Sequence, residues 1–323
     1  MRLLILGGTQ FAGRHVAAAA LTRGWRVTLF NRGRTDPGAF PEAEHLIGDR
    51  EVDLHALAQG EWDAVVDTSG YVPRVVRAAA ETLADRVGVY VFISSAGVYA
   101  DKSLAGLSED AKVIELDDLQ TEDVSAHYDG LKVLCERAVL EVFDGRAAIV
   151  RPGLIVGPHD PTNRFTYWVT RIADGGTVLA PEPRDQPVQV IDARDLAAFV
   201  LRLGSRGPAG TFNAVGDVST MEDVLTTIRS ATSSAAEFRW SAERRLLDAD
   251  VEPWDDLPLW LAPESDPTYR GFLAMSNARA KQAGLVLRPL EDTVRDTAAW
   301  AATVSVGPPR LDRDRERRLL IDG

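Results

Sequence analysis

The chain has 323 residues, about twice the usual size of a single domain, which predicts one large α/β unit or two unequal lobes and excludes a small disulfide-stapled module. A hydrophobic content of 45% beside 26% charged residues is ordinary for a globular protein and excludes disorder over the whole chain. The net charge of −12 opposes general attraction to nucleic acid or to an anionic membrane.

Short β-branched runs alternate with helical patterns from residue 2 to about residue 153. This rhythm is typical of βαβ units, and it predicts a doubly wound parallel sheet of the Rossmann type. The clear helices are expected over 14–22, 73–86 and 128–143. The strands are expected over 2–7, 25–31, 44–48, 63–68, 88–95 and 147–152.

After residue 153 the rhythm loosens, with short strands expected at 188–191 and 211–214. We therefore predict a smaller substrate-binding lobe over 154–305 that is interleaved with a dinucleotide-binding domain over 1–153, to which segments near 188–215 contribute. The prolines and tryptophans of 252–268 favour a lid or pocket wall. The charged tail, 306–323, alternates arginine with acidic residues and is expected to form a solvated or frayed helix.

Cellular location is constrained by the single cysteine and by the apolar runs. Cys135 cannot form an intramolecular disulfide, and with no histidine or second cysteine beside it no metal site is expected. It lies in an apolar helical stripe, which indicates a core thiol. No run approaches the roughly 18 apolar residues of a membrane span, and the first run is too short for a signal peptide. We expect a cytoplasmic protein without a membrane partner.

A glycine-rich turn joins the first predicted strand to the first predicted helix. Such a turn lets backbone N–H groups and a helix N-terminus face a pyrophosphate, which predicts a dinucleotide site. The common spacing would place a glycine at position 10, where this chain has a glutamine, so a side chain lies where the backbone usually approaches the phosphates. The predicted ligands in this turn are Gly7, Thr9, Gln10, Phe11 and Gly13.

The end of the second strand bears on the choice between NAD and NADP. An NAD site normally carries a carboxylate there for the ribose 2′-hydroxyl, whereas this chain has Asn31 followed by Arg32 and Arg34. Guanidinium groups match phosphate oxygens, so we predict a 2′-phosphate contact and NADP rather than NAD. Topology places further cofactor residues after the third and fourth strands, namely Asp49, Arg50, Thr68, Ser69 and Gly70.

Tyr128 and Lys132 are spaced i, i+4, which puts both side chains on one face of a helix. A neighbouring ammonium favours the phenolate and lowers the pKa of a tyrosine, so this spacing suits acid–base chemistry. Ser95 ends the fifth predicted strand, at the sheet edge where ligands of open α/β folds bind. The three residues together predict a site that polarises a carbonyl group.

Five motifs in order then resemble the extended or atypical branch of the short-chain dehydrogenase/reductase superfamily, the NAD(P)-dependent epimerase/dehydratases, over residues 1 to about 302. Besides the glycine turn they are Ser-Ser-Ala-Gly-Val-Tyr at 94–99, Tyr-Asp-Gly-Leu-Lys at 128–132, Arg-Pro-Gly-Leu-Ile-Val-Gly-Pro at 151–158 and Val-Ile-Asp-Ala-Arg-Asp-Leu-Ala at 190–197.

The resemblance implies roles for individual residues. Ser95 would donate a hydrogen bond to the carbonyl, Tyr128 would be the general acid or base, and Lys132 would also bind the nicotinamide ribose. The segment with Pro152 and Leu154 would flank the nicotinamide. A homodimer through the helices near 73–86 and 128–143 is expected by the same analogy.

The glycine turn and the Asn-Arg-Gly after the second strand look most like an atypical subgroup that includes chloroplast stem-loop RNA-binding proteins. Several of its members lack the tyrosine that this chain keeps.

Within this family the sequence favours some reactions over others. Dehydratases usually carry an Asp-Glu pair where this chain has Ala96 and Gly97, so dehydration is disfavoured. We therefore predict an NADP-dependent reductase or epimerase acting on a carbonyl or secondary alcohol of a small-molecule or sugar-like substrate. The alternative is a non-catalytic nucleotide- or RNA-binding Rossmann protein, against which the net charge and the complete Ser-Tyr-Lys set both argue. Candidate residues of the substrate wall are Tyr71, His159, Arg164, Tyr167, Trp168, Trp254 and Trp260.

Overall fold

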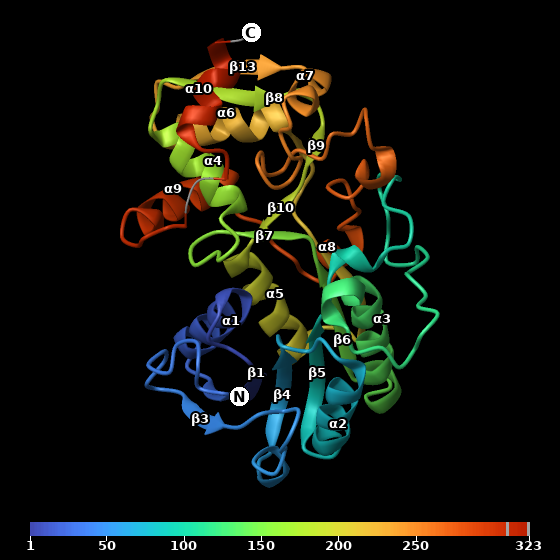
Figure 1. Cartoon of the computed structure of the whole chain (residues 1–323). Helices are drawn as coiled ribbons and strands as arrows, with labels where there is room; N and C mark the ends of the chain where they lie inside the picture. Colours follow the sequence, from blue (N-terminus) through green and yellow to red (C-terminus); the bar gives the residue numbers. More distant parts are fainter. Residues whose placement is uncertain (308–309, 322–323) are drawn as a thin grey trace.

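A computed structural model of the chain describes residues 1–307 and 310–321. The lower part of the molecule in Figure 1 is built on a parallel sheet that, within the described residues, has seven strands in the order β11-β6-β5-β4-β1-β2-β3. The strand order reverses at β1, which pairs with both β2 and β4, and a ligand crevice forms at such a point. The strands are β1 (Arg2–Leu6), β2 (Arg26–Asn31), β3 (Glu44–Ile47), β4 (Trp62–Asp67), β5 (Val87–Ile93), β6 (Ala147–Pro152) and β11 (Gly210–Ala214).

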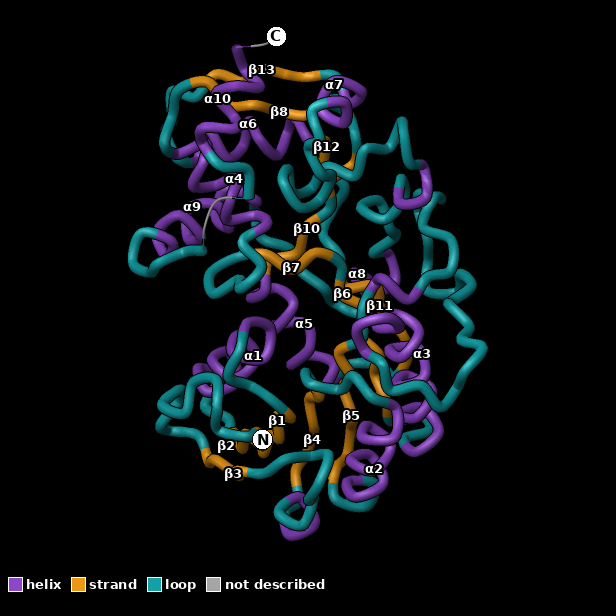
Figure 2. Tube along the Cα trace, viewed as in Figure 1, coloured by secondary structure: helices purple, strands orange, loops and turns teal. Residues whose placement is uncertain are grey.

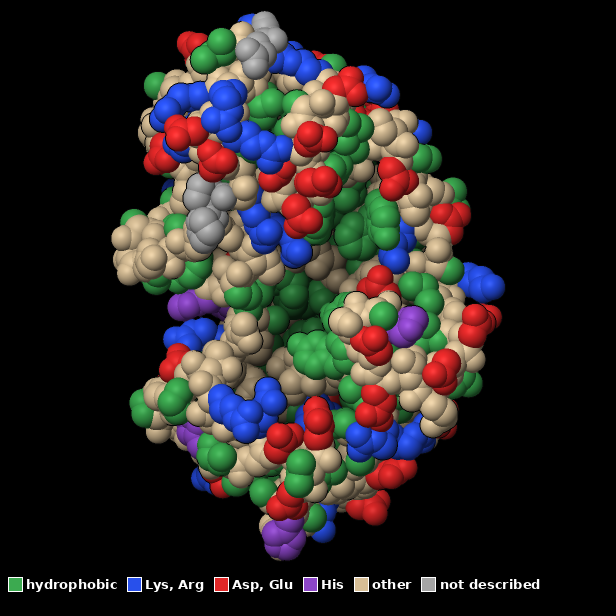
Figure 3. Space-filling view, viewed as in Figure 1, with side chains coloured by type: hydrophobic (Ala, Val, Ile, Leu, Met, Phe, Trp, Pro, Cys, Tyr) green, Lys and Arg blue, Asp and Glu red, His purple; other side chains and the backbone are tan. Residues whose placement is uncertain are grey.

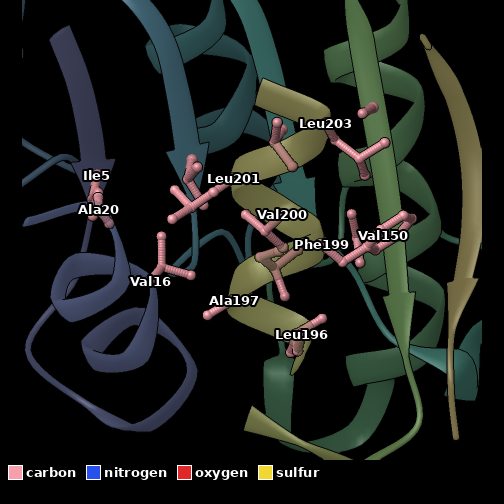
Figure 4. Close-up of a cluster of buried hydrophobic side chains, with 14 of the residues drawn as sticks. Ile5, Val16, Ala20, Val150, Leu196, Ala197, Phe199, Val200, Leu201 and Leu203 are labelled. Atoms are coloured by element: carbon pink, nitrogen blue, oxygen red, sulfur yellow. The ribbon is translucent and has the colours of Figure 1, made fainter. Parts of the chain in front are cut away.

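Helices cover both faces of this sheet, which is why its central strands are apolar on both sides. On one face α1 (Phe11–Thr22) packs against α5 (Ala193–Arg206), and their buried side chains form one cluster with those of the strands (Figure 4). On the other face α2 (Pro73–Leu83) packs against α3 (Val124–Val142), where Cys135 is buried as predicted. The doubly wound parallel fold predicted from the sequence is confirmed.

The six predicted strands before residue 153 are all present, and the first three predicted helices differ only at their ends. The largest difference is at α3, which begins four residues earlier than expected because Asp123 caps it by accepting hydrogen bonds from the N–H groups of Ser125 and Ala126. His127 has non-helical backbone angles, so the helix is kinked immediately before Tyr128. Two short 3₁₀ turns precede α3 in the chain: η1 (Leu57–Gln59) lies between β3 and β4, and η2 (Ala96–Val98) follows β5.

The upper part of the molecule in Figures 1 and 2 has its own apolar core. Here α4 (Arg164–Ala173), α6 (Met221–Ala231) and α9 (Leu290–Ala301) pack against one another. Beside them is a two-stranded parallel sheet of β8 (Thr177–Pro181) and β13 (Glu237–Ser241). The predicted strand at 188–191 is instead two short strands, because Gln189 turns its side chain inward to the carbonyl oxygens of Gly216 and Met275. Thus β9 (Pro187–Val188) pairs with β12 (Ser219–Thr220), and β10 (Val190–Asp192) pairs with β7 (Leu154–Val156).

The remaining elements of this lobe complete the chain. The segment 252–266 contains no regular helix or strand. The bounds are β7 (Leu154–Val156), α4 (Arg164–Ala173), β8 (Thr177–Pro181), β9 (Pro187–Val188), β10 (Val190–Asp192), β12 (Ser219–Thr220), α6 (Met221–Ala231), β13 (Glu237–Ser241), α7 (Glu243–Asp248), η3 (Pro267–Tyr269), α8 (Ala278–Gln282), α9 (Leu290–Ala301) and α10 (Arg313–Ile321). Within the described ranges, no helix combines the length and the apolar character that crossing a bilayer requires.

The charged tail is not the solvated helix expected from its sequence. Glu316 in α10 is 2% exposed and accepts hydrogen bonds from Arg171 Nε at 2.7 and 2.9 Å and from the Leu179 N–H at 3.1 Å. Leu311 is also buried. Within the alternating charges of the tail, Glu316 is buried and pairs with Arg171, which lies 145 positions earlier in the chain. This pair fastens α10 to the upper lobe. Residues 308–309 and 322–323 of the predicted tail lie outside the described residues.

Candidate active site

A cleft of about 550 Å³ lies at the carboxyl ends of the central strands, where the strand order reverses. Figure 3 shows the molecule hollowed between its lower and upper parts. Seventeen of the side chains and turns predicted from the sequence line this one cleft: Gly7, Thr9, Gln10, Phe11, Gly13, Asn31, Arg32, Arg34, Asp49, Arg50, Thr68, Ser69, Tyr71, Ser95, Tyr128, Lys132 and Pro152.

The glycine turn has the close packing that a bound pyrophosphate requires. Gly7 and Gly8 have φ angles of +106° and +93°, and a Cβ on Gly7 would lie 2.5 Å from Thr68 Oγ1. Any side chain at Gly7 would therefore be strained and would clash. Gln10 occupies the N-cap of α1 in an extended conformation, and its backbone carbonyl accepts from the Arg14 N–H at 3.2 Å. Its side chain forms no capping hydrogen bond, so the first N–H groups of α1 stay open toward the cleft.

Asn31 holds two loops of the cleft together. Its Nδ2 donates to the Gly7 carbonyl oxygen at 3.1 Å, and its Oδ1 accepts from the Gly33 N–H at 2.8 Å. Arg32 and Arg34 are both exposed at the rim, and neither forms an ion pair with any residue in the described part of the chain. The loop after β2 therefore presents two uncompensated positive charges beside the glycine turn.

A buried charged network lies beneath the middle of the cleft. Arg50 donates to both carboxylate oxygens of Asp67, at 2.7 and 2.9 Å, and to Ser69 Oγ at 3.3 Å, while the Tyr90 hydroxyl donates to Asp67 at 2.8 Å. Burial alone would raise the pKa of Asp67, but the charge and hydrogen bonds of Arg50 lower it overall. Topology predicted Arg50 to be a cofactor residue. It does line the cleft, but its charge is compensated inside the protein by Asp67, which sequence reasoning did not single out.

Lys132, the third residue of the predicted Ser-Tyr-Lys set, is almost fully buried. Its Nζ donates to the carbonyl oxygens of Gly70 at 2.8 Å and Ile93 at 2.6 Å, and it lies 4.5 Å from the centroid of the Phe92 ring. Burial lowers the pKa of Lys132 to about 8. Gly70 therefore contributes a carbonyl that orients the ammonium and does not itself line the cleft.

Tyr128 follows the kink in α3 and lies in the cleft beside Tyr71, with ring centroids 6.2 Å apart. Burial raises the pKa of Tyr128 to about 12, with further increases from Tyr71 and Asp129, while hydrogen bonding with Ser95 opposes them. The predicted lowering of this pKa by Lys132 is not seen, because the ammonium is directed to backbone carbonyls. The phenol is therefore protonated at neutral pH, which suits a proton donor.

Three aromatic candidates for the substrate wall lie in the core of the upper lobe. Trp168 and Trp260 are fully buried and Tyr167 is 2% exposed, so their side chains cannot reach a ligand. The Trp168 indole N–H donates to the Pro258 carbonyl at 2.6 Å. An aromatic residue in the sequence fits a core as well as a pocket wall, and the packing of these three in the apolar cluster of the upper lobe assigns them to the core.

Three other substrate candidates, His159, Arg164 and Trp254, do not line the cofactor cleft. The guanidinium of Arg164 lies 5.0 Å from the centroid of the Trp254 ring. His159 is exposed and lies between the rings of His15 and Trp300. Leu154 is buried in β7, and its neighbours Gly153 and Ile155 line the cleft in its place because side chains alternate along a strand.

Comparisons with known proteins identify the family of the chain. The model of the family described as "NAD dependent epimerase/dehydratase family" matches residues 3–215, which span the glycine turn, Ser95, Tyr128 and Lys132. The chain belongs to the NAD dependent epimerase/dehydratase family. A curated relative is the chloroplast stem-loop binding protein of 41 kDa b from Arabidopsis thaliana, 27% identical over 235 residues, which are 67% of this chain and 59% of that protein. The match thus spans less than two thirds of the relative.

Solved structures of this family share the whole fold. The UDP-glucuronic acid 4-epimerase from Bacillus cereus, in complex with NAD, has a TM-score of 0.66 and 15% identity, with 94% of this chain and 99% of that chain covered. The Bordetella bronchiseptica enzyme WbmG, in complex with NAD and UDP, has a TM-score of 0.69 and 15% identity, with 95% and 96% covered. At this identity the likeness establishes the arrangement of the elements.

Proposed function

We propose that this family member is an NADP-dependent reductase or epimerase that acts on a carbonyl or secondary alcohol of a small, sugar-like substrate. The observation that carries the proposal is that Ser95, Tyr128 and Lys132 line the same cleft as the glycine turn. The nucleotide sugars and UDP named with the solved relatives support a sugar-like ligand. The net effect favoured by a protonated Tyr128 is reduction of a carbonyl, since the phenol has a proton to give.

The residues at the cleft fit NADP. The open N-terminus of α1 and the turn at Gly7 and Gly8 suit a pyrophosphate, and the unpaired Arg32 and Arg34 suit a 2′-phosphate where an acid would select NAD. When bound, the nicotinamide exchanges a hydride with the substrate carbon. The role of the chain is then to hold the carbonyl oxygen with Ser95 and to pass it the proton of Tyr128.

The test of the reaction is NADPH oxidation over a panel of carbonyl compounds that includes nucleotide-linked keto sugars. Tyr128→Phe should keep the fold and NADPH binding and lose about 10²–10⁴-fold in turnover. Tyr71→Phe removes a phenol oxygen from the neighbouring ring and is the matched control, for which we expect less than about a tenfold loss. Full activity of Tyr128→Phe on an active substrate would disprove the assignment.

Cofactor preference is tested separately by titrating NADPH and NADH. The Arg34→Ser variant loses one charge-assisted contact, worth about 1.5–3 kcal/mol, so the dissociation constant for NADPH should rise about 10–150-fold while that for NADH changes little. Arg77→Ser, on the exposed face of α2, is the control. Equal or tighter binding of NADH by the wild type would rule out the NADP preference.

A binding function without catalysis is the second candidate, favoured by the stem-loop binding relative. Contacts with phosphates would make the affinity for RNA fall steeply with salt. Filter binding of a stem-loop RNA at 50 and 200 mM salt, beside the NADPH assay, separates the two candidates. Salt-dependent RNA binding with no turnover over the carbonyl panel would favour this second function.

A further inference from the structure

A second pair of ionisable side chains lies against Gly97, two residues after Ser95, and has no role in the function proposed above. Lys102 Nζ donates to Asp129 Oδ2 at 3.2 Å. Asp129 follows Tyr128 directly in α3, and Lys102 lies in the loop after η2, which itself follows Ser95. The Lys102 side chain is 10% exposed and that of Asp129 is 35% exposed, so the ammonium is covered while the carboxylate stays accessible.

The Asp129 carboxylate fills the space of a missing side chain at Gly97. A Cβ on Gly97 would lie 2.1 Å from Asp129 Oδ1 and 2.9 Å from Oδ2. The Gly97 N–H donates to Ser95 Oγ at 3.0 Å. These contacts place a carboxylate oxygen within about 8 Å of Ser95 Oγ. This limit is long enough for a substrate ketone to lie between the two groups. Ser95 would donate a hydrogen bond to the carbonyl oxygen, two covalent bonds would lead from that oxygen to the neighbouring carbon, and the carboxylate oxygen would approach that carbon to about 3–3.5 Å.

Lys102 is held in place by the upper lobe. The Gly271 N–H donates to the Lys102 carbonyl at 2.8 Å, and the Gly106 N–H donates to the Ala274 carbonyl at 2.6 Å, so the loop after η2 runs alongside the segment near η3. In Figure 1 these two segments lie side by side at the edge of the molecule. Lys102 Nζ also lies 5.7 Å from the centroid of the Tyr269 ring. The loop that carries Lys102 is thus held by the segment near η3, and the ammonium orients the carboxylate next to Gly97.

Resting on the function proposed above, we propose that Asp129, oriented by Lys102, is a second proton acceptor of this site and removes a proton from the carbon adjacent to the carbonyl held by Ser95 and Tyr128. The C–H bond breaks and its electron pair forms a C=C bond. The carbonyl π pair moves to the oxygen, where the two hydroxyls stabilise the enolate. Asp129 carries the proton and returns it, or solvent returns another, so no electron is gained or lost.

This assignment specifies the substrate class as a ketone with a hydrogen on the neighbouring carbon, as in keto sugars. It also revises the expectation drawn from Ala96 and Gly97. The loop after β5 carries no acid at these two positions, but α3 supplies a carboxylate to the same place. The site therefore has a group for chemistry at the carbon next to the carbonyl, in addition to hydride transfer at the carbonyl carbon itself.

The test follows deuterium incorporation by NMR in D₂O, with UDP-4-keto-6-deoxyglucose and dihydroxyacetone as probes, beside NADPH oxidation with the same compounds. We expect the wild type to exchange protons next to the carbonyl, and Asp129→Asn to lower that rate about 10²-fold or more, beyond any loss in reduction. Asp129→Glu should restore part of the exchange. Glu122→Gln, which breaks the exposed Arg74–Glu122 pair, is the matched control and should leave exchange unchanged.

The outcomes separate this inference from the proposed function. Reduction without exchange by the wild type, or equal exchange by Asp129→Asn, overturns the role of Asp129 and leaves the reductase in place. Exchange without reduction supports Asp129 and counts against the redox function. Absence of both with both probes overturns both. If Asp129→Asn lowers the thermal stability but leaves the exchange rate unchanged, the Lys102–Asp129 pair only holds the loop after η2 in place. That result also overturns the inference.

Discussion

Replacing Arg50 by Met should destabilise the protein strongly and in a pH-dependent manner. In the wild type, Asp67 is completely buried, and both of its oxygens accept hydrogen bonds from Arg50. Met fills most of the volume but leaves the carboxylate with only the Tyr90 hydroxyl and the Ser69 N–H as donors. Breaking a buried pair in this way costs about 3–5 kcal/mol, because an uncompensated charge remains in the interior.

The pH dependence follows from the carboxylate. In the wild type the pKa of Asp67 is below its ordinary value, so its contribution to stability is present above pH about 4 and is lost as the pH falls further. Without Arg50, burial raises this pKa, and the free energy of unfolding then decreases as the pH rises above about 4. The difference between variant and wild type should therefore be largest at neutral pH and should shrink toward pH 4.

Urea unfolding at pH 4, 5.5 and 7 measures both effects. The double variant Arg50→Met, Asp67→Leu removes the orphaned charge and should recover much of the loss. Arg77→Met is the matched control, since Arg77 and Glu141 form an exposed pair worth at most about 1 kcal/mol. A loss below about 1 kcal/mol for Arg50→Met, or the same loss at every pH, would refute the reasoning.

Three further predictions concern other parts of the molecule. Glu316→Ala leaves Arg171 buried without its partner and should cost about 3–5 kcal/mol in urea unfolding, whereas a solvated tail would show almost no change. If turnover requires the charged ammonium of Lys132, turnover at saturating NADPH should fall above pH about 8, where Lys132 loses its proton. A flat pH–rate profile to pH 10 would contradict a requirement for the ammonium. Light scattering should give about twice the chain mass of 35.1 kDa if α2 and α3 form a dimer interface, and a monomer would contradict it.

The sequence was most informative where the signal is local. A strand, a glycine turn and a helix in succession predicted the first βαβ unit, and the i, i+4 spacing of Tyr128 and Lys132 predicted their common face. Ser95 joined them because the ends of parallel strands meet at one edge of a sheet. These patterns were sufficient to place the lining of one cleft.

The features that the sequence did not reveal depend on partners far apart in the chain. Arg50 turns to Asp67 because the carboxylate is buried, and Glu316 pairs with Arg171 for the same reason. Neither pairing produces a periodic pattern in the sequence. Trp168 in an apolar run is equally consistent with a core and a ligand wall, and only its burial decides. An acidic residue at the end of an otherwise apolar strand, as at Asp67 in β4, is a signal that was present in the sequence and was not used.

The edge strand β11 has a consequence for how the protein is made. This strand pairs with β6, and α5 immediately before it covers the sheet beside α1, yet both are synthesised only after the chain has already built β7, α4, β8, β9 and β10 of the other lobe. The first 153 residues emerging from the ribosome therefore expose the unpaired edge of β6 and an uncovered apolar face. We therefore expect the growing chain to need protection from aggregation until residue 214 has emerged, and we expect a fragment that ends at residue 153 not to fold alone.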